Sequence, residues 1–207
     1  MERREAVKSI GLGSAALFTS SLFLGTLSGC SSAPKVNWIP VFLTPEEAVQ
    51  LEKICEAIIP KDETPGALDA GVPAHIDETL KALTEADDAQ WIRQGMGIFV
   101  RNFDASQDVT FNKATTQQLT DYINAMFKAI EESPEKMQGM WNAMNEEGEK
   151  PEDALEVFFL ENVTNATVRS YYTSELVGET VMRYDPIPVK YEGCISYESG
   201  QKAWSSV

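Results

Sequence analysis

The chain has 207 residues and is strongly acidic, with 32 Asp and Glu against 17 Lys and Arg and a formal net charge of −15 at pH 7. A surface of this charge repels the phosphates of DNA and RNA, so we exclude a nucleic-acid partner. Most of the acidic side chains are interpreted as solvated faces of helices. The length is that of one ordinary domain and is enough to bury a single core.

The first 30 residues carry two export signals. Arg3, Arg4 and Lys8 follow the Arg-Arg-x-x-apolar-Lys order of a twin-arginine signal. The apolar, small-residue-rich segment 10–27 ends in Leu-Ser-Gly-Cys, a lipobox that predicts cleavage before Cys30 and lipidation of its thiol. The alternative is a membrane span, which the three glycines and the terminal cysteine of this segment disfavour.

These signals also predict localisation and domain boundaries. We expect residues 1–29 to be a twin-arginine-like signal peptide of the lipoprotein type, residues 30–43 a lipidated tether, and residues 44–207 a helical domain. Several acyl chains on Cys30 would hold the mature chain stably at a membrane. The protein is therefore expected to be exported and anchored, facing the periplasm or the cell exterior.

The domain is predicted to begin with a capped helix. Thr44 is a suitable N-cap, Pro45 needs no hydrogen-bond partner at the first helical position, and Glu47 completes a capping box. This helix is expected to extend to about Ile58, before Pro60. The polar loop that follows contains acidic residues, but their spacing lacks the ligand order of a calcium-binding loop.

Apolar residues at helical spacing predict five further helices. They cover residues 72–83, 87–103, 116–132 and 137–148, and a longer stretch from Pro151 past Tyr172. Short strands are expected only near residues 186–195. The predicted fold is mainly α, a single compact helical domain with an extended, turn-rich C-terminal tail. The fifth helix in the chain carries a stripe that we interpret as core packing rather than a cofactor site: Met137, Met140, Trp141 and Met144.

The cysteines of the domain differ in their surroundings. Cys55 shares a helical face with Leu51 and Ile54, which predicts a small core residue. Cys194 lies in the turn-rich tail, and in an oxidising compartment three states are open to it. It pairs with Cys55, pairs with another chain, or stays free.

The sequence has few residues suited to catalysis or cofactor binding. His75 is the single histidine and is interpreted as an ordinary first-turn helix residue. We find no haem-attachment motif, no cysteine set for an iron–sulfur cluster and no G-x-S-x-G nucleophile elbow. A dinucleotide-binding pattern at residues 11–16 lies within the signal peptide and is rejected. We therefore assign no catalytic, cofactor-binding or metal-binding residue.

The C-terminal part contains residue types that are enriched at protein interfaces. Pro186 and Pro188 would stiffen an extended tail that lies along a partner at small entropic cost. The equally weighted alternative is that this tail wraps its own domain. The candidate interface residues are Tyr171, Tyr172, Arg183, Tyr184, Asp185, Tyr191 and Cys194.

Ordered motifs between Phe42 and Cys194 resemble the small subunit, subunit 3, of the gluconate 2-dehydrogenase family. They are Phe42-Leu43-Thr44-Pro45-Glu46-Glu47, Ile-Ile-Pro-Lys-Asp-Glu-Thr-Pro-Gly-Ala at 58–67, Ala70-Gly71-Val72, Tyr171-Tyr172-Thr173-Ser174-Glu175, Arg183-Tyr184-Asp185-Pro186 and Tyr191-Glu192-Gly193-Cys194.

The resemblance implies an accessory role. In that family the small subunit accompanies a flavin-dependent sugar or sugar-acid dehydrogenase of the glucose-methanol-choline type, often with a cytochrome c subunit. The catalytic residues and FAD belong to the large subunit, so no active-site residue transfers to this chain. This fits the twin-arginine route, which commonly carries proteins that have already acquired a cofactor. The alternatives are a stand-alone cell-envelope lipoprotein that binds a ligand or partner, and an enzyme in its own right.

Overall fold

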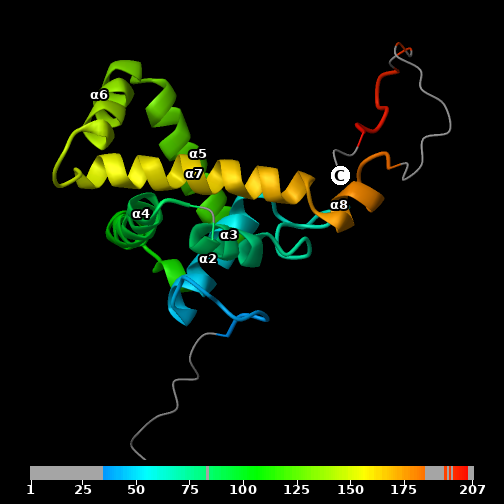
Figure 1. The fold of residues 1–207 in the computed structure, drawn as a ribbon, viewed down its shortest axis with the longest axis horizontal. Coiled ribbons are helices and arrows are strands. Elements are labelled where there is room, and N and C mark those ends of the chain that lie inside the picture. The colour runs from blue at the N-terminus through cyan, green and yellow to red at the C-terminus, as the bar shows by residue number, and fades with distance from the viewer. Residues whose placement is uncertain (1–34, 83, 185–193, 195, 197, 205–207) are drawn as a thin grey trace, which may run out of the picture. The chain divides into compact units, whose positions relative to one another are not determined.

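The computed structural model describes residues 35–82, 84–184, 194, 196 and 198–204 (Figure 1). This part of the chain forms one compact unit in which helices are the main secondary structure, so the predicted fold class is confirmed. No helix in it is long and apolar enough to cross a membrane. The elements are α2 (Pro45–Ile58), α3 (Val72–Ala82), α4 (Ala86–Ser106), the 3-10 helix η1 (Phe111–Lys113), α5 (Thr116–Glu131), α6 (Pro134–Asn145), α7 (Glu152–Tyr172) and α8 (Glu175–Thr180).

The start of α2 has the predicted capping box. The backbone N–H of Glu47 donates to Thr44 Oγ1 at 3.3 Å, and the N–H of Thr44 donates to Glu47 Oε2 at 2.8 Å. The other carboxylate oxygen of Glu47 accepts from Nε of Arg93 in α4 at 2.6 Å. The cap therefore also joins α2 to α4.

A buried carboxylate fixes the chain just before α2. Asp77 lies in α3 with none of its surface exposed, and its oxygens accept hydrogen bonds from three consecutive backbone N–H groups. The distances are 2.6 Å from Val41, 3.2 Å from Phe42 and 2.8 Å from Leu43. Residues 41–43 are consequently bound to α3 before α2 begins.

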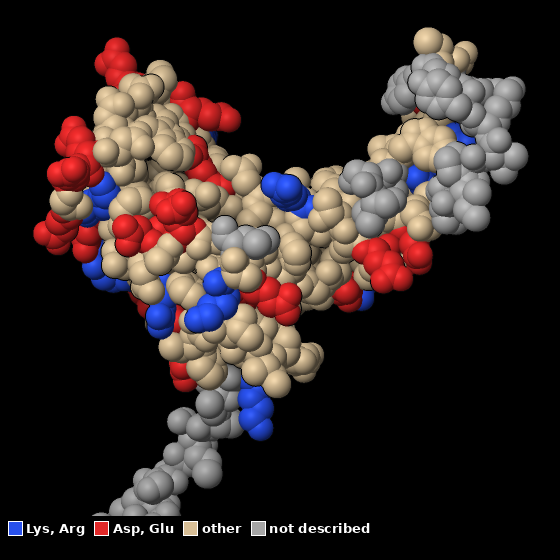
Figure 2. Space-filling model, in the orientation of Figure 1, with Lys and Arg blue, Asp and Glu red and all other residues tan. Residues whose placement is uncertain are grey.

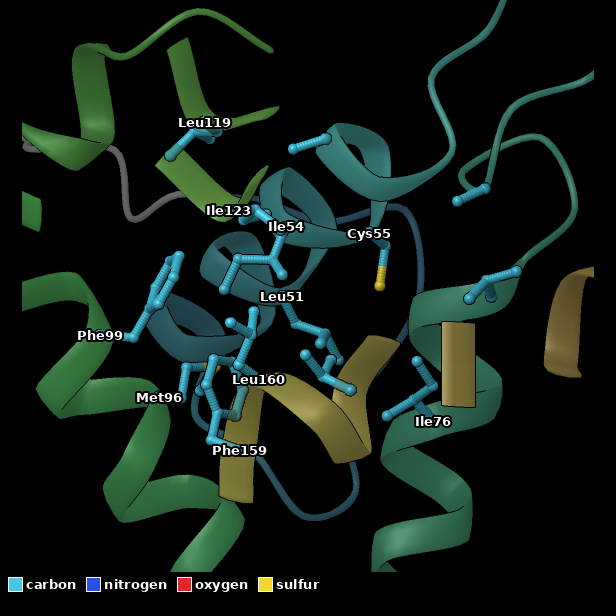
Figure 3. Close-up of a cluster of buried hydrophobic side chains, with 14 of the residues drawn as sticks. Leu51, Ile54, Cys55, Ile76, Met96, Phe99, Leu119, Ile123, Phe159 and Leu160 are labelled. Atoms are coloured by element: carbon cyan, nitrogen blue, oxygen red, sulfur yellow. The ribbon is translucent and has the colours of Figure 1, made fainter. Parts of the chain in front are cut away.

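The long helix α7 packs against α4, α3, α6 and α2 and forms the centre of the fold (Figure 1). Its approach to α4 depends on Gly95, where a Cβ atom would overlap the Leu155 carbonyl oxygen and lie 2.5 Å from the Phe159 Cβ. Beside this crossing lies the main core, part of which is drawn in Figure 3. The side chains labelled there are Leu51, Ile54, Cys55, Ile76, Met96, Phe99, Leu119, Ile123, Phe159 and Leu160.

Two predictions for the later helices need correction. The stripe on α6 packs on a second cluster but is less buried than expected: Met144 is buried, Met140 is partly buried against that cluster, and the Trp141 side chain is 37% exposed. The reason is that α6 packs on α7 and α5 at the margin of the fold, where one face suffices to cover a small second cluster. Helix α6 also ends at Asn145, before Gly148, and the short helix α8 was not predicted.

Candidate functional site

The end of α7 and the start of α8 present exposed apolar side chains to solvent. Val168 is 40% exposed, Tyr172 48% and Leu176 37%. Val168 and Tyr172 are four residues apart on α7 and therefore lie on one face of that helix. We call these three residues the apolar edge. Aromatic residues such as Tyr172 are enriched in protein–protein contact surfaces.

Neighbouring residues anchor the apolar edge to the core. The Tyr171 side chain is only 4% exposed, and its hydroxyl donates to the Pro65 carbonyl at 2.7 Å. Ser174 caps α8 by accepting from the Val177 N–H at 3.4 Å, and Val177 is fully buried. Because Tyr171 and Val177 point inward, Tyr172 and Leu176 next to them are held outward on a fixed backbone.

A groove with a volume of about 490 Å³ lies between α3, the start of α4 and the second half of α7. We call it the α3–α7 groove. Its apolar lining includes Ile76, Leu80 and Ile92. Residues Asn165 and Arg169 of α7 line it as well, and each is three or four positions from a member of the apolar edge. The groove and the apolar edge are therefore adjacent along one helix.

The α3–α7 groove contains one guanidinium group, that of Arg169, in a protein of negative overall charge. Arg169 of α7 and His75 of α3 both line it, with Asp88 at the start of α4. In the part of the chain that the structure describes, the Arg169 guanidinium enters no ion pair. A guanidinium with free donors beside an apolar surface suits a carboxylate or a backbone carbonyl of a binding partner.

The described part of the tail returns to the domain near α8. The Arg183 N–H donates to the Ala203 carbonyl at 2.7 Å, and the Arg183 guanidinium lies 4.1 Å from the centre of the Trp204 ring. Lys202 Nζ donates to the Thr180 carbonyl at 2.8 Å. These contacts join residues 202–204 to the end of α8 and to Arg183, while Tyr184 keeps 43% of its surface exposed. The two alternatives for the tail, along a partner or around its own domain, both stay predictions.

A model of the family described as gluconate 2-dehydrogenase subunit 3 matches residues 45–189, a range that contains the helices of the described residues, the groove and the apolar edge. The chain belongs to this family. It is accordingly an accessory subunit that associates with a larger dehydrogenase complex. Neither the curated proteins nor the solved structures gave a match.

Within this subunit the candidate interface residues fall into different environments. Tyr172, Arg183, Tyr184 and Cys194 are exposed. Tyr171 is buried and bound to Pro65, so this side chain leaves the set of interface candidates. Other predicted residues lie outside the described part of the chain and stay predictions, namely Asp185 and Tyr191 together with Arg3, Arg4 and Cys30.

The two cysteines that the structure describes are both free thiols. Cys55 is fully buried, as predicted, and its sulfur lies 3.4 Å from the Thr167 hydroxyl. Burial raises the pKa of the Cys55 thiol to about 12. Cys194 is exposed, so of the three states that the sequence left open, pairing with Cys55 is absent in this fold.

The acidic loop between α2 and α3 uses its carboxylates internally. Asp62 accepts from the N–H and hydroxyl of Thr64 at 2.7 and 2.8 Å, and Asp69 accepts from Gly66 N–H and Lys61 Nζ, both at 3.1 Å. No group of three or more His, Cys, Asp or Glu side chains suited to a metal ion occurs among the described residues. The loop is a self-bonded turn that positions Pro65 for Tyr171.

One buried carboxyl group lacks a full set of partners. Glu156 of α7 is 9% exposed, and its Oε2 accepts from Asn102 Nδ2 at 2.8 Å, whereas Oε1 has no hydrogen-bond partner. Burial raises the pKa of this carboxyl group above its ordinary value. Glu156 borders a small cavity of about 170 Å³ between α5, α6 and α7, away from the apolar edge.

Proposed function

We propose that this chain is the non-catalytic small subunit of a membrane-associated, FAD-dependent sugar or sugar-acid dehydrogenase of the glucose-methanol-choline type. It supports the export, folding and anchoring of the catalytic subunit, which carries FAD. A cytochrome c subunit would accept the electrons. The observation that carries this proposal is the apolar edge of Val168, Tyr172 and Leu176 beside the α3–α7 groove, a preformed surface in a family of accessory subunits.

The apolar edge has the composition of an interface anchor. Tyrosine brings a large contact area with only two rotatable bonds, so little conformational entropy is lost when it is buried. Its backbone is already fixed through Tyr171 and Val177, which lowers the ordering cost further. We expect the catalytic subunit to cover Tyr172 with an apolar pocket and to place a carboxylate or carbonyl oxygen near Arg169.

The N-terminal signals supply the address in this proposal. Arg3 and Arg4 would direct the folded pair of subunits to the twin-arginine route, and Cys30 would become the lipid anchor after cleavage. A cofactor-bearing partner that folds in the cytoplasm would thereby be exported on a signal that belongs to this chain. The mature complex would face the periplasm or the cell exterior.

Co-purification of the catalytic subunit with variants of this chain tests the docking surface. Tyr172→Ala and Leu176→Ala should each weaken the complex by about 1 to 3 kcal/mol, the usual cost of truncating an interface anchor. Leu68→Ala is a matched control, because Leu68 is an exposed leucine of similar accessibility, at 42%, on the loop between α2 and α3. If the Leu68 variant loses the partner and the other two keep it, the apolar edge is not the docking surface.

A second candidate function is a lipoprotein that binds a small ligand by itself. The observation that favours it is the α3–α7 groove, whose volume of about 490 Å³ lies in the range of small-molecule sites and whose walls carry Arg169 and His75. Under this alternative, the isolated chain binds an anionic small molecule, and Arg169→Ala abolishes that binding. Such a chain would bind its ligand without any dehydrogenase subunit.

A further inference from the structure

The residues that lead into α2 expose apolar side chains at the start of the described chain. We call residues 35–43 the entry segment. Ile39 is 87% exposed, the highest value among the large hydrophobic residues of the described chain, and Val41 is 51% exposed. Exposure of branched aliphatic side chains to water is unfavourable. A covering environment would remove this cost.

The backbone of the entry segment is held in place. Asp77 binds the N–H groups of Val41, Phe42 and Leu43, and Trp38 donates its indole N–H to Glu52 Oε1 in α2 at 2.9 Å. These bonds lie on both sides of Ile39. Its side chain is therefore displayed from a braced backbone, and the exposure follows from packing of the segment on α2 and α3.

The charge around the entry segment differs from that of the rest of the surface. In Figure 2 acidic side chains gather over the end of the domain that carries α6 and beside α8. The lower tip of the domain, where the described chain begins, is mostly uncharged in this view, with an acidic side chain at its edge and a basic side chain next to the grey N-terminal residues. Lys35, the first described residue, is exposed. This part of the surface is therefore compatible with anionic phospholipid.

The sequence places the entry segment close to the proposed lipid anchor. Lys35 is five positions and Ile39 nine positions after Cys30, so an extended chain spans at most about 18 and 32 Å respectively. Acyl chains on Cys30 would thus keep Ile39 within reach of the bilayer surface. Once the chain is anchored, a contact that is weak in solution becomes effectively intramolecular and is largely populated.

We propose that the entry segment is a membrane-contact surface, in which Ile39 and Val41 insert into the interfacial region of the phospholipid bilayer beside the acyl chains of Cys30. This inference rests on the lipidation in the proposed function. Trp38 suits such a position, since an indole ring with a satisfied N–H is favoured at the membrane interface. Bonds from Asp77 and Glu52 would then set the orientation of the whole domain on the membrane.

Fluorescence at Ile39 in vesicles tests this contact directly. The full chain is expressed with its own signal, purified as the mature lipoprotein, and reconstituted into vesicles of phosphatidylethanolamine and phosphatidylglycerol. An environment-sensitive fluorophore is attached to Ile39→Cys in a Cys194→Ser background, which removes the exposed native thiol. Gln138→Cys, on an exposed position of α6, is the matched control.

We expect the fluorophore at residue 39 to shift its emission to the blue in vesicles, and nitroxide-labelled lipids to quench it several-fold more than the label at residue 138. If both labels are quenched equally in a chain whose acylation is verified by mass spectrometry, the membrane contact of the entry segment is contradicted. The proposed function is not affected by that result. An unacylated mature chain would remove both the anchor of the proposed function and this inference. Shielding of residue 39 only after the catalytic subunit is added would overturn the inference in favour of a protein contact.

Discussion

Replacement of Asp77 by Ala should destabilise the fold more than any other single charge removal in α3. The buried carboxylate is replaced by a methyl group, and three backbone N–H groups, those of Val41, Phe42 and Leu43, lose their acceptor. A hydrogen bond to a charged group contributes about 1.5 to 3 kcal/mol, and an unpaired buried donor costs a similar amount. Because these bonds share one carboxylate and are not additive, we expect a total loss of about 3 to 5 kcal/mol.

A loss of this size is readily measured. In a domain of this length each kcal/mol lowers the melting temperature by about 2 to 4 °C, so Asp77→Ala should melt at least about 6 °C below the parent chain. Asp77→Asn should also destabilise the fold, because the side-chain NH2 of Asn would face a backbone N–H group, and two donors cannot bond to each other. The control is Glu78→Ala, which removes an exposed carboxylate from the next position of the same helix. A loss below about 1 kcal/mol in urea unfolding of Asp77→Ala would refute the reasoning.

Three further predictions concern other groups. The raised pKa of Glu156 means that the folded chain binds this proton more tightly than the unfolded chain, so its contribution to stability is present at low pH and is lost as the pH rises through the folded-state pKa. Glu156→Gln should therefore be more stable than the parent chain at pH 8 and no more stable than it at pH 4 in urea unfolding. A thiol reagent should modify Cys194 in the folded chain and Cys55 only after denaturation, as counted by absorbance, because burial raises the pKa of Cys55 to about 12. Replacing Arg3 and Arg4 together with Lys should retain the precursor in the cytoplasm, and normal fractionation of that variant would remove the twin-arginine signal from the account.

The features that sequence reasoning predicted well depend on residues close together in the chain. Thr44 and Glu47 form their predicted capping box within one turn. The burial of Cys55 followed from the spacing of its helical neighbours. In each of these cases the local pattern and the three-dimensional contacts lead to the same structure.

The features that were not predicted depend on contacts between distant segments. Asp77 is more than 30 residues from the backbone groups that it binds, and Tyr171 reaches Pro65 across 106 residues, so an aromatic residue that was interpreted as an interface anchor is part of the core. The close approach at Gly95 could not be read from the pattern either, because Gly97 lies in the same helix and a Cβ there would meet nothing within 4 Å. The α3–α7 groove arises from the packing of three helices, which no local pattern specifies.

The most direct test of the accessory-subunit role is the oxidation of sugars by membranes that lack this chain. Dye-linked sugar and sugar-acid dehydrogenase activity is measured in membranes from cells in which the gene is deleted, and again after complementation with the parent chain or with Tyr172→Ala. We predict that deletion abolishes the membrane-bound activity, that the parent chain restores it, and that Tyr172→Ala restores it only in part. A catalytic subunit that stays exported, membrane-bound and fully active without this chain would contradict the account.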